Sequence, residues 1–263
     1  MSRLSAALLV LGLAAGEGAA QEGDKVGKDK APVVARKAMA EIQKKKGAAI
    51  AETSQLGTAQ ETSSTFQGVM KKDFAAVKGS AEIYARGKVS ILRTGDRYDL
   101  AANLKGEEAL TAASFRNPAV MLGDAGRLVN GAVYLNDEAV DGKDCKVVSL
   151  VADPRMLKEH LQEVAEVVQK QLTGFARDLF SGNLTGYLDE KISTSRFVLW
   201  VGKADLLVHK MEWVLEAETK AASLPPGVQP FKVTRRCEVK FSQWDEDLPF
   251  DVPAPVKVRL GLK

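Results

Sequence analysis

The chain has 263 residues, of which 37 are Lys or Arg, 34 are Asp or Glu and two are His, and its formal net charge is +3. Only Lys44, Lys45 and Lys46 form a basic run, so the charge pattern does not indicate a nucleic-acid-binding protein. The 45% hydrophobic content is ample for a folded core, while the absence of nucleotide, phosphate, nucleophile-elbow and paired-cysteine metal motifs predicts a protein without cofactor or metal and disfavours an enzyme.

The amino terminus has the pattern of an export signal. Arg3 precedes an apolar run from Leu4 to Ala15, and Gly18-Ala19-Ala20 offers small residues for cleavage. The apolar run is shorter than the roughly 20 residues that span a bilayer as a helix. We therefore expect residues 1–20 to be removed near Ala20 and the mature protein to be periplasmic. An uncleaved membrane anchor is the alternative, because Glu17 is unusual just before a cut.

The next segments lead into one large domain. Residues 21–32 are rich in Gly, Lys, Asp and Glu and are predicted to be disordered. Apolar residues then recur every three or four positions over 33–46, which predicts an amphipathic helix ended by Gly47. Residues 48–64 lack a clear period, so we expect a mobile or weakly helical connector there, within a single domain over 33–263.

Alternating patterns predict antiparallel strands further along the chain. Apolar residues occupy alternate positions over 81–91 and again over 98–104, on either side of the turn Thr94-Gly95-Asp96. A shorter strand is expected over 109–115, closed by Asn117-Pro118. A further hairpin is expected from 133–135 and 143–151, with a turn at Asp141-Gly142.

One long helix is predicted to interrupt the sheet. Asp153 is a suitable N-cap, Pro154 suits the first helical position, and apolar residues line one side as far as Leu172. We expect this helix to act as a lid through Met156, Leu157, Leu161, Val164 and Val168.

The last third of the chain alternates most clearly. After a strand at 197–201, the odd positions of 207–217 and of 231–241 are mostly apolar, and the even positions are mostly charged or polar. A period of two places these sets on opposite faces, so both segments are predicted to be half-buried antiparallel strands. The apolar face of so large a sheet must be covered by helices, by a second sheet or by a ligand.

The two cysteines, Cys145 and Cys237, lie on predicted strands of an exported chain. We expect them to form a disulfide, which would stabilise the fold by about 4 kcal/mol in the chain-entropy model. Two buried thiols are the alternative.

Other polar residues are interpreted as structural. His160 and Glu163 are one helical turn apart but have no third metal ligand in sequence, and His209 has no nucleophile beside it. The carboxylates from Asp245 to Asp251 differ in spacing from a calcium loop and suit a solvated turn.

The order of these elements resembles the LolA-like and LppX/LprG-like periplasmic carriers of lipids and lipoproteins. The resemblance rests on the Asp141-Gly142-Lys143 turn, on "LWVGKADLLVHKMEW", where Leu207 to Met211 fit L-x-x-K/R-M, and on the ending "VKFSQWDEDLPFDVPAPV". It implies an incomplete barrel, a strongly curved antiparallel sheet whose concave face is closed by helices and holds acyl chains. The α+β class deduced from the residues agrees with this.

The sequence therefore predicts a non-catalytic carrier that binds a lipid or an acylated protein in an apolar concavity. An envelope protein is a further expected partner, and no nucleic acid is expected. The alternative is an envelope sensor or interaction module on the same fold, with its concavity filled by its own side chains. The residues expected to line the concavity are Ile83, Ile91, Leu100, Leu199, Met211, Trp213, Val239 and Phe241.

Overall fold

The computed structural model describes residues 26–57, 61–171, 184–224, 229–246, 248–249 and 251–262. The predicted export signal, its cut near Ala20, Leu172 at the end of the lid helix, and Asp247 lie outside these ranges. Val26 is buried, so the prediction of disorder over 21–32 is wrong for the part of it that the structure describes.

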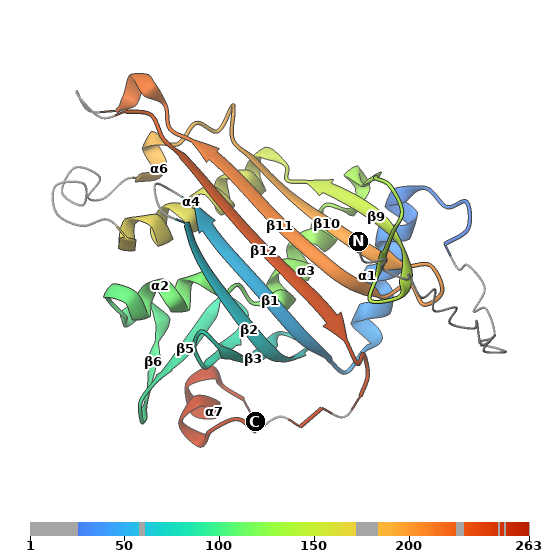
Figure 1. The fold of residues 1–263 in the computed structure, drawn as a ribbon, viewed down its shortest axis with the longest axis horizontal. Coiled ribbons are helices and arrows are strands. Elements are labelled where there is room, and N and C mark those ends of the chain that lie inside the picture. The colour runs from blue at the N-terminus through green and yellow to red at the C-terminus, as the bar shows by residue number, and fades with distance from the viewer. Residues whose placement is uncertain are drawn as a thin grey trace, which may run out of the picture.

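One antiparallel sheet of twelve strands dominates the fold (Figure 1). Its order is β6-β5-β4-β3-β2-β1-β12-β11-β10-β9-β7, with β8 paired to β9. The edge strands β6 and β7 do not pair with each other, so the curved sheet remains an incomplete barrel, as predicted. The strands are β1 (Ala48–Gly57), β2 (Glu61–Lys71), β3 (Phe74–Gly79), β4 (Ile83–Arg86), β5 (Val89–Thr94), β6 (Arg97–Leu100), β7 (Val133–Tyr134), β8 (Glu138–Val140), β9 (Lys143–Val151), β10 (Thr194–Gly202), β11 (Val208–Glu218) and β12 (Lys232–Ser242).

Helices cover one face of this sheet. In Figure 1, α3 and α4 lie behind the long strands, whereas α7 lies beside the short strands. The helices are α1 (Ala31–Lys44), α2 (Gly106–Ser114), α3 (Pro118–Arg127), α4 (Pro154–Gln171), α6 (Leu184–Tyr187) and α7 (Ala254–Leu260), with the 3₁₀ turns η1 (Ala101–Asn103), η2 (Val129–Gly131) and η3 (Ala221–Ser223). None of the helices within the described ranges is both long enough and apolar enough to cross a membrane.

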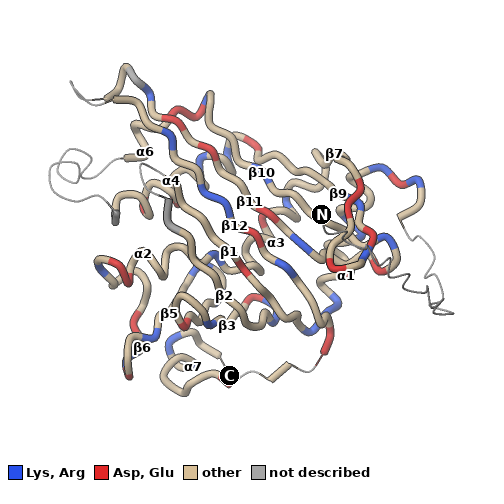
Figure 2. Tube along the Cα trace, in the orientation of Figure 1, with Lys and Arg blue, Asp and Glu red and all other residues tan. Residues whose placement is uncertain are grey.

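The strands predicted in the last third of the chain are confirmed as β10, β11 and β12, and the long helix predicted after Asp153 is confirmed as α4. Along β12, buried and exposed residues alternate almost without interruption, and Figure 2 shows Lys, Arg, Asp and Glu spaced along the long strands. On α4, Met156, Leu161, Val164 and Val168 are buried and Leu157 is partly buried, all within the main core. The amphipathic helix expected over 33–46 is also present as α1.

Two predictions of local structure are wrong. The expected connector over 48–64 contains β1 and the start of β2, and β1 is a central strand between β2 and β12. Its inner positions include Glu52 and Ser54 between Ile50 and Leu56, and these polar residues conceal the alternation. The expected strand over 109–115 is helix α2, whose Ala-rich sequence and two early glutamates favour a helix.

The turn between β4 and β5 divides what the sequence indicates as one long strand over 81–91. Gly87 adopts a left-handed conformation there, with a φ of 55°. Ile91 consequently pairs with Tyr84 and not with Ile83. Ile83 faces the main core, whereas Ile91 belongs to a second cluster on which α7 packs through Val256 and Leu260, with Val252 just before the helix.

The predicted disulfide is absent, and both cysteines are free, buried thiols. Cys237 lies in the main core, whereas Cys145 packs with Val147, Val198 and Trp200 in a cluster of its own. Between their strands, β12 and β9, lie β11 and β10.

Candidate functional site

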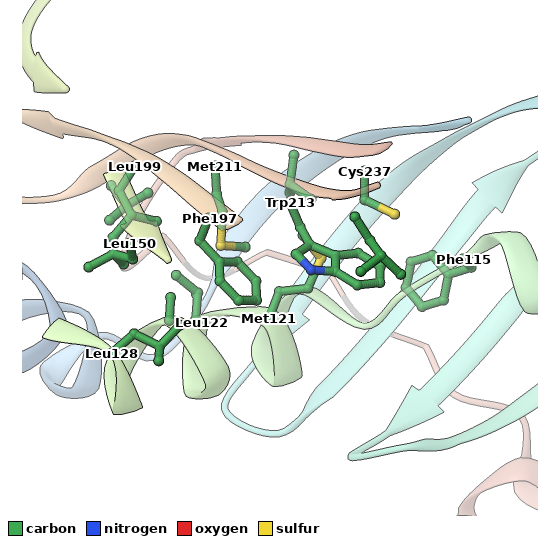
Figure 3. Close-up of a cluster of buried hydrophobic side chains, with 14 of the residues drawn as sticks. Phe115, Met121, Leu122, Leu128, Leu150, Phe197, Leu199, Met211, Trp213 and Cys237 are labelled. Atoms are coloured by element: carbon green, nitrogen blue, oxygen red, sulfur yellow. The ribbon is translucent and has the colours of Figure 1, made fainter. Parts of the chain in front are cut away.

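The centre of the concave face is a closed core. In Figure 3, side chains of the long strands point toward those of α3, with Trp213 between the two layers. Six of the eight residues expected to contact a ligand are buried in this main core, namely Ile83, Leu199, Met211, Trp213, Val239 and Phe241. Ile91 is buried in the second cluster, and Leu100 packs partly against it. The predicted residues therefore do not form one open surface.

A polar cluster surrounds Trp213 inside this core. The Trp213 indole N–H donates to Ser195 Oγ at 2.9 Å, and Ser195 Oγ lies 2.7 Å from His160 Nδ1. The guanidinium carbons of Arg116 and Arg235 lie 3.9 Å and 5.2 Å from a Trp213 ring centroid, within cation–π range. His160 is thus a buried partner of Ser195, as its structural interpretation requires.

Ion pairs compensate the two buried arginines. Glu163 on α4 accepts from Arg116 Nε at 3.1 Å and from Arg235 Nη1 at 3.3 Å, and Arg116 Nη2 donates to Asp124 at 3.0 Å. Burial opposes ionisation of Glu163, but the two guanidinium groups outweigh it and lower the pKa of this carboxyl. The pKa of Asp124 is likewise lowered, because His160 and Arg116 stabilise its charge against the effect of burial.

Glu52 is the least compensated acid of the cluster. Its Oε1 accepts from the Arg116 backbone N–H at 3.1 Å, while Oε2 has no hydrogen-bond partner among the described residues. Burial raises the pKa of Glu52 to about 8, so the folded protein holds this carboxyl largely protonated at neutral pH.

The sequence contained a signal for part of this cluster. Arg235 occupies an odd, inward position in the alternating segment 231–241, where a charged residue needs a buried partner. Glu52 holds the equivalent inward position on β1. Arg116, in the α2–α3 connection, has no such pattern around it, and only the tertiary structure brings it to Trp213.

Two pockets lie at the side of the closed core. The first, which we name the α2–α4 pocket, has a volume of about 660 Å³ and lies between α2, α4, β5 and η1. Arg116, Glu163 and Arg235 line it on one side, and Leu100 is the one predicted ligand residue that reaches it. Its apolar lining consists of Val89, Leu100, Ala101, Ala102, Ala112, Ala113, Phe115, Val120 and Val167.

The second pocket, which we name the α1–α3 pocket, has a volume of about 570 Å³. Its charged residues are Lys45, Lys72, Arg127 and Asp73, an excess of positive charge. Its apolar lining consists of Met39, Ile42, Met70, Ala119, Val120, Leu122 and Trp244.

The remaining polar candidates are structural. His209 Nε2 lies 3.0 Å from Asp205, a partner four residues earlier that the sequence interpretation overlooked. Asp245 accepts from the Lys46 backbone N–H at 3.0 Å and pairs with Lys45, so it holds a turn. The described part of the chain contains no group of three or more His, Cys, Asp or Glu placed to hold a metal.

Comparisons with known proteins return distant structural neighbours. No protein-family model and no curated protein matches the chain. LprF from Mycobacterium bovis is 12% identical with a TM-score of 0.38, over 86% of this chain and 97% of that one. Lipoprotein LppX from Mycobacterium tuberculosis is 8% identical with a TM-score of 0.41, over 84% and 97%. A LolA superfamily protein from Nitrosomonas europaea is 13% identical with a TM-score of 0.30, over 84% and 96%.

These proteins are of the group that the sequence resembles.

Proposed function

We propose that this protein is a non-catalytic carrier that binds the acyl chains of a lipid or of an acylated protein. The observation that carries the proposal is that the helical layer leaves two apolar-lined pockets, of about 660 and 570 Å³, beside a core that is otherwise closed. Both volumes fall within the range of about 300–1,000 Å³ that is usual for small-molecule sites.

The lining of the pockets suits an acyl chain better than a polar substrate. Transfer of each methylene group from water into such a pocket contributes about 0.8 kcal/mol, so a long chain binds without a catalytic or metal centre. The two buried arginines of the α2–α4 pocket are paired with Glu163, so the apolar wall is expected to be the main source of affinity for the chain itself.

The carrier is proposed to work in the periplasm. The support is the sequence pattern of residues 1–20, in which an apolar run follows Arg3 and ends in small residues. Amino-terminal sequencing of the mature protein tests this part: a first residue at or near Gln21 is expected, and an intact Met1 in the membrane fraction would contradict it.

One observation favours the alternative of an interaction module with a self-filled concavity. Trp213 and Met211 are fully buried by side chains of the protein itself, so the centre of the concave face holds no ligand space. On this alternative, the two pockets would bind no lipid, and the protein would act through its outer surfaces.

Binding of an apolar probe decides between the two functions. The full chain, tested with a fluorescent fatty-acid analogue, is expected to bind it saturably and to release it to palmitate. Ala113→Leu with Gly126→Leu narrows both pockets and is expected to weaken binding at least tenfold, because both residues line pocket walls and a Cβ at Gly126 meets only Met39 at 3.9 Å.

The matched control is Ala51→Leu with Gly131→Leu, at exposed positions outside both pockets. It is expected to bind like the wild type. A folded wild type that takes up neither the probe nor palmitate would favour the interaction module instead.

A further inference from the structure

The two pockets share one wall. Gly87, in the turn between β4 and β5, lines both of them, and so does Val120 in the first turn of α3. The α2–α4 pocket extends from this wall toward α4, and the α1–α3 pocket extends toward α1 and Trp244. A ligand that reached over Gly87 would therefore have access to both.

Asn117 holds this wall in place. It is 5% exposed, and its Nδ2 donates to the carbonyl oxygens of Asp73 and Gly87, both at 3.1 Å. Its Oδ1 accepts from the Ala119 N–H at 3.1 Å and so caps α3. The Gly87 N–H also donates to the Asp73 carbonyl at 2.9 Å. Hydrogen bonds thus join the β2–β3 turn, the β4–β5 turn and the start of α3 into one unit. The wall between the two pockets is therefore held by hydrogen bonds and not by side-chain packing alone.

Each pocket has a lysine on this unit. Lys72, in the β2–β3 turn, lines the α1–α3 pocket, and Lys88, in the β4–β5 turn, lines the α2–α4 pocket. Both are exposed, and within the described part of the chain neither forms an ion pair within 4.0 Å. The space above Gly87 is open, since a Cβ built there would meet no atom within 4 Å.

We propose that one anionic lipid with two acyl chains straddles this wall, with one chain in each pocket and its phosphate above Gly87 between Lys72 and Lys88. The similar volumes of about 660 and 570 Å³ suit two chains of similar length. A lysine ammonium is a point charge on a flexible stem, and it binds a phosphate from either side without a fixed geometry. This inference rests on the proposed carrier function and specifies its ligand.

The number of bound chains tests the two-pocket arrangement. By native mass spectrometry, the wild type is expected to bind two molecules of palmitate but one molecule of phosphatidylglycerol. Ala113→Leu, which narrows only the α2–α4 pocket, and Gly126→Leu, which narrows only the α1–α3 pocket, are each expected to bind one palmitate. Each single variant is expected to bind phosphatidylglycerol at least tenfold more weakly than the wild type. The control variant Ala51→Leu is expected to bind both palmitate and phosphatidylglycerol like the wild type.

The charge of the headgroup is tested separately. Lys72→Gln with Lys88→Gln is expected to weaken phosphatidylglycerol binding about tenfold and to leave phosphatidylcholine, whose headgroup has no net charge, within twofold of the wild type. Urea unfolding of every variant, with a midpoint close to that of the wild type, shows that a loss of binding is not a loss of folding.

The outcomes separate this inference from the carrier function. If the wild type binds one palmitate per protein molecule, and only one of the two single variants loses it, the proposal of a lipid in both pockets is wrong. The protein would then be a carrier of a single acyl chain. Equal effects of the lysine variant on both phospholipids would overturn the headgroup assignment. Absence of every lipid from the folded wild type would overturn the carrier function itself.

Discussion

At the scale of single residues, burial disfavours the ionised form of the Glu52 carboxyl group. Its pKa is raised from an ordinary value of 4.5 to about 8 because the group is buried, so between these values the folded protein keeps a proton that the unfolded chain releases. The free energy of unfolding should therefore fall as pH rises through this window, by at most about 1.4 kcal/mol per pH unit, and this contribution levels off above pH 8.

Glu52→Gln removes this titration. Compared with the wild type, the variant should gain stability between pH 5 and pH 8.5, as measured by urea unfolding at several pH values. Glu108→Gln, at an exposed position of α2, is the control and should keep the pH dependence of the wild type. A Glu52→Gln variant whose stability runs parallel to that of the wild type at all pH values would mean that Glu52 is ionised in the folded protein.

Asn117 gives a second prediction for a single residue. Asn117→Asp keeps the oxygen that caps α3 but replaces the donor to the Asp73 and Gly87 carbonyls with a buried carboxylate oxygen. Loss of two hydrogen bonds and the repulsion of these oxygens should cost about 2 kcal/mol or more in the free energy of unfolding. Asn103→Asp, in η1, is the control and should cost little; equal unfolding midpoints for both variants would show that Asn117 does not tie the turns together.

At the scale of elements, the strands and helices that the sequence predicted correctly are those whose apolar residues follow the strand or helix period without interruption. β11, β12 and α4 each bury an almost unbroken set of apolar residues, so their patterns correspond to their structures. β1 was missed because two of its inner residues are polar. Helix α3 was missed because Gly123 and Gly126 weaken its helical pattern, and the capping role of Asn117 is apparent only with the helix in view.

The C-terminal helix α7 owes its structure to its docking surface. Seven residues are too few for a stable isolated helix, so its stability comes from Val256 and Leu260 in the second cluster. Leu260→Ala should lower the free energy of unfolding by about 2 kcal/mol. Val258→Ala, on the same helix but 81% exposed, should change it by less than about 0.5 kcal/mol, and chemical denaturation measures both. Equal effects would mean that α7 does not pack on the sheet as described.

At the scale of the whole molecule, the sheet keeps the two cysteines apart. Cys145 and Cys237 are on strands separated by two others, which places them at least about 14 Å apart at the usual strand spacing, beyond the reach of a disulfide. Burial also raises the pKa of the Cys145 thiol to about 11 and raises that of Cys237.

Thiol labelling checks this arrangement. The native protein should react slowly, and denaturation without reductant should release two reactive thiols per chain. If the denatured chain reacts only after reduction, the two thiols form a disulfide, as the sequence analysis predicted, and the arrangement described here is wrong.

The overall architecture could be predicted from the sequence, whereas the position of the pockets could not. One-sided strands and an amphipathic helix suffice to predict a sheet covered by helices. The pockets depend on where α2, α3 and two hairpin turns meet, and residues such as Ala113, Gly87 and Val120 have no pattern of their own. Apolar strand positions indicated burial, and in this protein most of the buried positions belong to the main core.

The pairing of β1 with β12 also affects how the chain folds. β1 ends at Gly57, and its partner begins at Lys232, so one edge of β1 stays unpaired until a segment more than 170 residues later in the chain joins it. An unpaired edge invites pairing with other unfolded chains, and an inward-pointing charge is one of the devices that prevent it. Glu52, ionised until the protein folds, supplies that charge. We therefore expect the carboxyl that lowers the stability of the folded protein to protect the unfolded chain, so the Glu52→Gln variant should aggregate more than the wild type during refolding, as measured by light scattering.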